Sequence, residues 1–310
     1  MSARFIAGLA ALLALGSAAH AQETVREKLE RDFGEGFSIH KTEHWLIAHS
    51  TTDERARLVG ESLERVRAEF VRTFESIGFE IEEPGEPLVF VVYGSRESFD
   101  EYMRRRVRPV EIMGSGLYSP RTNRVSLIVP RTRRRSGDSS LINLVVHEGT
   151  HQIAFNLGVL NRRESYPPWF GEGLASTFET RSLEGEFGPL TDSVSRRLAA
   201  TARMVAEDRA MPLEELLALQ RPSESADPEE RQLARAGNLA IYGQGASLVT
   251  YLIRERPEQM KEYIDALERL PRFRDPDSLW HGAFEAAFGE VDEFERAWKT
   301  WLAGLDGGRR

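Results

Sequence analysis

The sequence contains no cysteine. Disulfide bonds, thiolate metal ligands and lipid attachment through an N-terminal cysteine are therefore all excluded. A chain of 310 residues can do without disulfides, because it can bury a large hydrophobic core. Its hydrophobic fraction of 41% and charged fraction of 29% are typical of a globular protein. Any metal site in this chain must therefore be built without thiolate ligands.

Long hydrophobic runs are also missing. An apolar run from Phe5 to about Leu15 follows Arg4 and precedes Ala19-His20-Ala21. A basic start, a short apolar segment and an A-x-A site are typical of a signal peptide, so we expect a periplasmic or secreted protein that is cleaved after Ala21. An uncleaved membrane anchor is the alternative, but the run is short for a bilayer and no later stretch is long enough. We expect no transmembrane helix in the mature chain.

The chain lacks an excess of basic residues: 41 lysines and arginines stand against 49 acidic residues, a formal net charge of −8. We therefore expect no nucleic-acid partner. The segment Arg104–Arg135 reverses this balance, with ten arginines and one acid, Glu111. A solvated face whose arginines pair with acids elsewhere explains such a run. The alternative is a surface that docks an anionic substrate or the cell envelope.

The most informative segment is Leu144-Val145-Val146-His147-Glu148-Gly149-Thr150-His151-Gln152. Ser139 or Asp138 can cap the start of a helix that Gly158 closes. Apolar residues surround this helix on nearly every side, which predicts a buried helix. Because unpaired buried polar groups are costly, its two histidines and its glutamate need partners.

His147 and His151 lie four residues apart and project from one helix face, close enough to share one ion. Glu148 borders the same site. This H-E-x-x-H arrangement predicts two imidazole ligands for Zn²⁺ and a carboxylate that takes a proton from a metal-activated water. The alternative is a pair of core histidines with backbone or carboxylate partners. Gly149 costs up to about 1 kcal/mol relative to alanine within a helix, which predicts that another element crosses close behind the histidines.

The remaining pattern predicts an α+β fold: a small mixed β-sheet with helices and the H-E-x-x-H helix, followed by a mainly helical part. Strands are expected at 44–49, 87–93, 116–118 and 124–129, the last two as a hairpin. Helices are expected at 22–33, 52–76, 95–105, 168–179, 193–208, 212–219, 229–254, 257–269, 277–288 and 291–303. We divide the chain into a signal peptide (1–21), an α/β subdomain ending in the H-E-x-x-H helix (22–165) and a helical subdomain (166–310).

A catalytic zinc usually has three protein ligands and one open position. In Pro167–Ala175, Glu172 lies 21 positions after His151. Flanking glycines allow another backbone to approach, and neighbouring aromatic residues exclude water. Without the upstream motif, such a glutamate would be an ordinary surface residue at a helix start. We expect the early histidines to be structural or exposed; they are His40, His44 and His49.

Three segments together resemble the gluzincin zinc metallopeptidases, the clan of thermolysin and the leucyl-type aminopeptidases; they are His147–Gln152, Pro168–Ala175 and Tyr242–Leu252. The sequence is most similar to the peptidase MA-like bacterial families, over roughly residues 85 to 303. The spacing from His151 to Glu172 is slightly longer than in the aminopeptidases. The glycine-rich substrate motif of the exopeptidases is absent, so aminopeptidase activity is not implied. The resemblance implies a gluzincin-like fold, one Zn²⁺ per chain and a peptide or protein substrate.

The resemblance also implies roles for single residues. His147, His151 and Glu172 would hold Zn²⁺. Glu148 would act as general base and then as general acid. Tyr242 would donate a hydrogen bond to the developing oxyanion, although an ordinary tyrosine packed between helices fits this position equally well.

Two further groups surround this set. Ser176 and Glu179 fall on the same helix face as Glu172 and are candidates for orienting a ligand. In this clan, the strand before the motif helix lies at a sheet edge and pairs with extended substrate. The candidates for that substrate strand are Val125, Leu127 and Val129.

We predict an exported zinc metallopeptidase that hydrolyses peptide bonds, with Glu148 as the general base. The alternative is a non-catalytic module of the same fold that retains zinc and binds peptide or envelope polymer. An intact Glu148 favours the enzyme, because a binding module needs no general base. A purely structural zinc is a third possibility, but such sites usually have four protein ligands and only three good candidates are visible.

Overall fold

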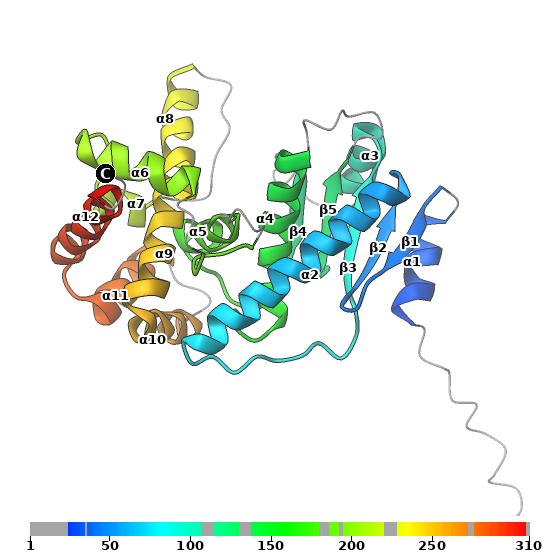
Figure 1. The fold of residues 1–310 in the computed structure, drawn as a ribbon, viewed down its shortest axis with the longest axis horizontal. Helices are drawn as coiled ribbons and strands as arrows, with labels where there is room; N and C mark the ends of the chain where they lie inside the picture. Colours follow the sequence, from blue (N-terminus) through cyan, green and yellow to red (C-terminus); the bar gives the residue numbers. More distant parts are fainter. Residues whose placement is uncertain are drawn as a thin grey trace, which may run out of the picture.

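The computed structural model describes residues 24–34, 36–106, 115–129, 138–179, 181, 186–191, 195–219, 228–271 and 276–307. A β-sheet with its helices lies at one end of the molecule and a group of helices lies at the other (Figure 1). The predicted α+β fold, with a mixed sheet followed by a helical C-terminal region, is confirmed. The predicted signal peptide lies outside the described residues, and the boundary at residue 165 stays a prediction.

Within the described residues, the sheet has five strands in the order β1 (Ser38–Lys41), β2 (Trp45–His49), β3 (Leu88–Tyr93), β5 (Arg124–Ile128) and β4 (Gly116–Ser119). The three central strands β2, β3 and β5 are parallel, and the two edge strands β1 and β4 are antiparallel to their neighbours. The strands β2 and β3 are buried along their whole length, as their continuous apolar runs indicate. The short, half-exposed β1 was not predicted, because Ser-Ile-His-Lys carries little apolar signal.

Helices cover both faces of the sheet. One face packs against α2 (Asp53–Ser76) and α4 (Asp138–Asn156), where Trp45, Ile47 and Phe90 join the main core. The opposite face holds a smaller apolar cluster under α1 (Val25–Phe33) and α3 (Arg96–Arg106). Adjacent strand residues such as Ile47 and Ala48 therefore enter different clusters, as the pleat of a strand requires. The sheet is covered on both sides, and α4 lies on the face of the larger core.

The hairpin of β4 and β5 was predicted, but the position of β5 in the sheet was not. β5 pairs with β3 on one side and with β4 on the other. Both of its edges are therefore filled, and it cannot accept an extended peptide. The prediction of Val125, Leu127 and Val129 as a substrate strand is wrong, since all three are buried in the core. β4 is the strand at this edge of the sheet.

The second half of the chain is helical. Its elements are α5 (Pro168–Phe178), α6 (Arg196–Ala206), α7 (Leu213–Leu217), α8 (Pro228–Leu239), η3 (Ala240–Gln244), α9 (Gly245–Glu255), α10 (Pro257–Glu268), α11 (Pro276–Phe288) and α12 (Val291–Gly307). The single helix expected at 229–254 is interrupted by η3, a turn of π-helix that joins α8 to α9. No helix among the described residues is long and apolar enough to cross a membrane.

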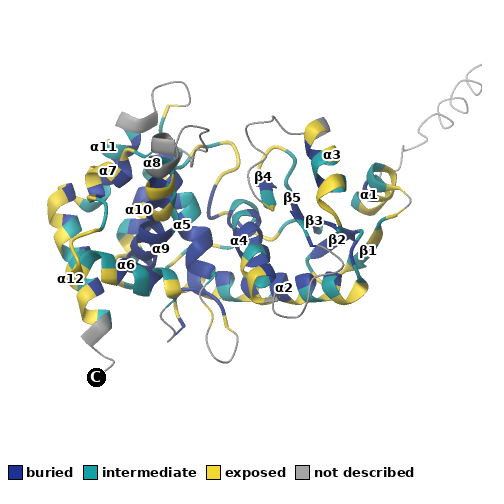
Figure 2. Ribbon diagram, turned by 90° about the horizontal axis from the view of Figure 1, so that it is seen from above, coloured by how far each residue is buried: buried dark blue, intermediate teal, exposed yellow. Residues whose placement is uncertain are grey.

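The helices α5 and α9 cross at two glycines. A Cβ atom on Gly173 would lie 2.5 Å from the backbone carbon of Gly245, and one on Gly245 would lie 2.5 Å from the carbonyl oxygen of Trp169. Only glycine permits this backbone approach. Thr177 adds a hydrogen bond of 3.0 Å from its hydroxyl to the carbonyl of Ala246. Figure 2 shows the buried residues concentrated along α4, α5 and α9, which places these helices at the centre of the molecule.

Candidate metal centre

The helix α4 is fixed from behind by α2. A Cβ atom on Gly149 would lie 2.6 Å from Cδ2 of Leu63, so the two helices touch where Gly149 has no side chain. This is the crossing element that the mid-helix glycine predicts. Gln152 fixes α4 to the sheet: its side chain accepts a hydrogen bond from the Trp45 indole (3.0 Å) and donates one to the Val89 carbonyl (3.0 Å). Because Gln152 is fully buried, these bonds hold one orientation of the helix.

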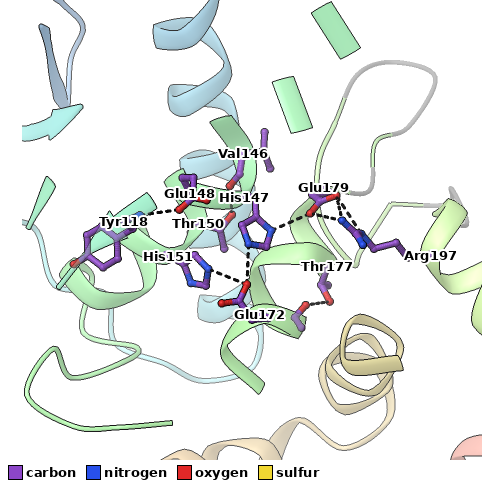
Figure 3. A network of polar contacts seen from close by, with 11 residues as sticks. Tyr118, Val146, His147, Glu148, Thr150, His151, Glu172, Thr177, Glu179 and Arg197 are labelled. Carbon is purple, nitrogen blue, oxygen red and sulfur yellow. Dashed lines mark hydrogen bonds and ion pairs between the residues drawn. The ribbon is translucent and has the colours of Figure 1, made fainter. Parts of the chain in front are cut away.

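Glu172 reaches the two histidines from α5. Nε2 of His147 lies 3.0 Å from Oε2 of Glu172, and Nε2 of His151 lies 3.6 Å from the same oxygen (Figure 3). One donor atom from each of the three residues lies within 4.8 Å of the other two. These three residues could therefore hold a metal ion, through two imidazoles and a carboxylate.

The charges of the centre favour a cation. Burial alone lowers the pKa of His147, but its hydrogen bonds to Glu172 and Glu179 raise it to about 10. Burial acts to raise the pKa of Glu172, yet His151 and His147 hold it well below its usual range. The surroundings thus stabilise a positive charge between carboxylates, and the same field would stabilise a metal ion. The donor set fits a divalent metal such as zinc.

Glu179 fixes the ring of His147. Its Oε1 atom lies 2.9 Å from Nδ1 of His147, which leaves Nε2 directed at Glu172. This is the usual arrangement of a metal-binding histidine, in which a second carboxylate sets the tautomer and the ring orientation. Glu179 follows α5 directly, seven residues after Glu172, and makes the contact expected from that spacing. Ser176 does not: its hydroxyl is buried and has no hydrogen-bond partner within the part of the chain that the structure describes.

Glu148 lies beside the three donors and contacts the edge strand. Its Oε2 atom accepts a hydrogen bond of 2.8 Å from the backbone N–H of Tyr118 in β4. Burial raises the pKa of Glu148, while His147 and His151 oppose this effect. Gly116 allows the approach, because a Cβ atom there would lie 3.2 Å from Cγ of Glu148. A buried carboxylate with a raised pKa is well suited to proton transfer.

Tyr242 enters the centre from η3. Its ring centroid lies 5.8 Å from that of His147, and the carboxylate of Glu172 is among the groups that act on its hydroxyl. Burial, together with the nearby carboxylates of Glu172 and Glu148, raises the pKa of Tyr242, so the hydroxyl keeps its proton. It is therefore available as a hydrogen-bond donor. Short π-helical turns are frequent at functional sites, because they displace one side chain from the regular helical pattern.

The early histidines do not join this centre. Nδ1 of His44 lies 2.6 Å from Glu64, and Nε2 of the buried His49 lies 3.8 Å from Asp53. His40 lies on the edge strand β1. These contacts agree with structural roles.

The Arg104–Arg135 segment is only partly described. Arg104 and Arg121 are exposed, whereas Arg124 is half-buried and forms an ion pair of 2.8 Å with Asp32. The side chains of the other seven arginines lie outside the described residues; they are Arg105, Arg106, Arg108, Arg131, Arg133, Arg134 and Arg135. Docking of an anionic surface stays a prediction.

One contributor to the centre was missed from the sequence. Arg197, in the first turn of α6, donates hydrogen bonds of 3.0 to 3.2 Å to both oxygens of Glu179 (Figure 3). The two residues lie 18 positions apart in the sequence, and an arginine near a helix start gives no signal of such a partner. The contact became visible only through the fold.

Fold and site together define an α+β protein with a buried candidate metal centre. Residues 141–274 match a family described as a protein of unknown function (DUF1570). The matched range begins in α4 and contains the three metal-binding candidates, Glu148 and Tyr242. No curated protein matches the chain.

Proposed function

We propose that this protein is a zinc-dependent metallopeptidase. The observation that carries the proposal is the convergence of His147, His151 and Glu172 on one point, with Glu148 beside them. Two imidazoles and a carboxylate on adjacent helices form the ligand set of a hydrolytic zinc site that keeps an open position. When bound there, Zn²⁺ supplies a Lewis acid that polarises the scissile carbonyl and makes a water molecule more acidic.

Three residues of the protein would carry out the remaining steps, which are proton transfer, stabilisation of the oxyanion and orientation of a ligand. Glu148 takes the proton of the attacking water and delivers it to the leaving amine. Tyr242 donates its hydroxyl proton in a hydrogen bond to the carbonyl oxygen as negative charge develops there. Glu179 keeps His147 in one orientation throughout. Each group is held by packing, so little reorganisation is needed during the reaction.

We propose that the substrate is an extended peptide that adds to β4. This strand lies at the edge of the sheet, and its Tyr118 already directs a backbone N–H toward Glu148. Main-chain pairing with an exposed edge recognises peptides with little regard to their side chains. The peptide would thereby lie alongside the proposed base. This assignment takes the place of β5, whose edges are filled.

The contact between Glu148 and Tyr118 also supports the second candidate, a zinc-retaining module that binds peptide without cleaving it. A carboxylate engaged by a backbone N–H can act as a structural clamp. Glu148→Gln separates the two functions. For a peptidase, the variant keeps its metal and loses about 10²-fold or more of its activity on a peptide library. For a binding module, neither wild type nor variant cleaves any member of the library, and both retain peptide equally.

A further inference from the structure

Arg197 contacts two residues of the centre that come from different elements. Its Nε and Nη2 atoms donate to both oxygens of Glu179, at 3.2 Å and at 3.0 to 3.1 Å. Its Cζ atom also lies 5.7 Å from the ring centroid of Tyr242, within the range of a cation–π contact. A single guanidinium thus bridges α6, the end of α5 and η3.

The contact with Glu179 continues to the metal-binding candidates. Oε1 of Glu179 accepts from Nη2 of Arg197 (3.1 Å) and also lies 2.9 Å from Nδ1 of His147. A carboxylate held by a two-pronged guanidinium has little rotational freedom. The position of Arg197 therefore limits how the ring of His147 can turn.

Charge gives Arg197 a second effect. Glu148, Glu172 and Glu179 place three carboxylates at the centre, with most of their surface removed from water. A divalent cation balances two of them, and the guanidinium of Arg197 balances the third. Without Arg197, one negative charge at a buried site would lack a counter-charge, which lowers the stability of the folded protein. A guanidinium also repels a metal ion, so any gain in metal affinity from Arg197 must come from the fixed position of Glu179 and not from its charge.

We propose that Arg197 is a positioning residue that sets metal affinity through Glu179 and turnover through Tyr242. The turnover part rests on the proposed function. The affinity part needs only a metal held by His147, His151 and Glu172.

The affinity part is tested by measuring the zinc dissociation constant in competition with a chelator. Arg197→Met should weaken zinc binding about 10-fold, the lower end of the effect expected for a group behind a ligand. Arg197→Lys should lie between wild type and Arg197→Met, because an ammonium can still donate a hydrogen bond to Glu179 but lacks the planar fork that holds both of its oxygens. Arg196→Met, at an exposed position of the same helix turn, is the matched control and should bind zinc like wild type.

The route through Glu179 is tested by combining substitutions. If Arg197 acts through Glu179, the double variant Arg197→Met/Glu179→Gln binds zinc no more weakly than Glu179→Gln alone. If the two substitutions weakened zinc binding independently, so that their fold-changes multiplied in the double variant, this route would be overturned. Equal zinc affinity of wild type and Arg197→Met would overturn the affinity part altogether.

A readout without metal distinguishes this proposal from the proposed function. In the metal-free protein labelled with ¹⁵N-histidine, the Nδ1 proton of His147 should be protected by Glu179 and give a sharp signal, assigned by its loss in His147→Ala. The signal should broaden in Arg197→Met and persist in Arg196→Met. An unchanged signal in Arg197→Met would contradict the positioning role, even if zinc binding and hydrolysis were found. Failure of wild type to bind zinc would overturn both the proposed function and the affinity part, whereas the ¹⁵N signal would still decide whether Arg197 positions His147 through Glu179.

The turnover part is tested by measuring kcat and KM at saturating zinc, with a peptide that the wild-type protein cleaves as the substrate. Arg197→Met should lower kcat about 10-fold and leave KM unchanged. Without the guanidinium beside its ring, the side chain of Tyr242 is no longer held in one position, and small displacements of a reacting group are costly. The loss should vanish in a Tyr242→Phe background. A loss of the same size in both backgrounds would show that Arg197 does not act through Tyr242.

Discussion

The backbone N–H of Tyr118 donates a 2.8 Å hydrogen bond to the carboxylate of Glu148, which links the edge strand β4 to the helix that carries both histidines. Tyr118 lies opposite Val125 in the pairing of β4 with β5. The proposed base and the proposed substrate strand are therefore held in contact. A change in either one should affect the other.

Gly116→Val should reduce turnover without releasing metal. A Cβ atom at Gly116 would lie 3.1 Å from Cδ1 of Leu144 and 3.2 Å from Cγ of Glu148, so a branched side chain must displace the carboxylate. We expect kcat to fall about 10-fold or more, since small displacements of a reacting group are costly. Steady-state kinetics with parallel metal analysis would measure this. Gly85→Val, at a position with open space around it, is the control, and an equal loss there would refute the explanation.

Gly149→Ala should destabilise the protein, although alanine is the better helix former. The new methyl group would lie 2.6 Å from Cδ2 of Leu63 in the contact between α4 and α2. Overpacking of this kind costs about 1–3 kcal/mol, more than the gain of about 1 kcal/mol from helix propensity. Urea denaturation would show a lower midpoint. Gly282→Ala, a helical position with open space, should instead be neutral or stabilising.

Tyr242→Phe decides whether this tyrosine takes part in the reaction. Loss of a single donor to a developing oxyanion costs about 100-fold in kcat. Zinc content and the free energy of unfolding should stay near the wild-type values, because the ring remains. Unchanged kcat in Tyr242→Phe would mean that Tyr242 only packs between helices, despite its ring contact with His147.

Glu64 should contribute to stability at neutral pH and lose this contribution in acid. Burial opposes ionisation, but hydrogen bonds from Thr42 and His44 lower the pKa of Glu64 below its ordinary value. A depressed pKa adds stability above the unfolded-state value of about 4.3, and this stability disappears as pH falls through the folded-state pKa. The difference in unfolding free energy between wild type and Glu64→Gln should therefore be larger at pH 7 than at pH 3. An equal difference at both values would contradict the pKa shift.

The sequence predicted most of the site because its chemistry depends on local spacing. His147 and His151 share a helix face through their separation of four residues, and Glu179 shares a face with Glu172 through a separation of seven. Such relationships follow from helix geometry alone. The position of Glu172 needed the resemblance to a known family, since only the fold brings α5 beside α4.

The features that were missed depend on contacts between distant segments. The pattern of β5 predicts a strand but not which neighbours it has, so its interior position and the edge position of β4 became clear only in the folded sheet. The strand β1 is too short and polar to be recognised, and forms through its pairing with β2. The π-helical turn η3 lies within a segment whose apolar pattern predicts one uninterrupted helix. Arg197 contacts Glu179 across a separation of 18 residues, which no local spacing rule predicts.

The most direct test of the central claim is the metal content of the protein purified without added metal, measured by mass spectrometry. The comparison includes wild type, His147→Ala and Glu172→Ala, with Arg196→Met as a surface control. The proposed centre predicts about one zinc per chain in wild type and in the control, and loss of zinc in both ligand variants. Zinc that stays bound without Glu172 would show that the third ligand is wrong. Absence of metal from wild type, even after zinc is supplied, would contradict the proposed metal centre and the peptidase function with it.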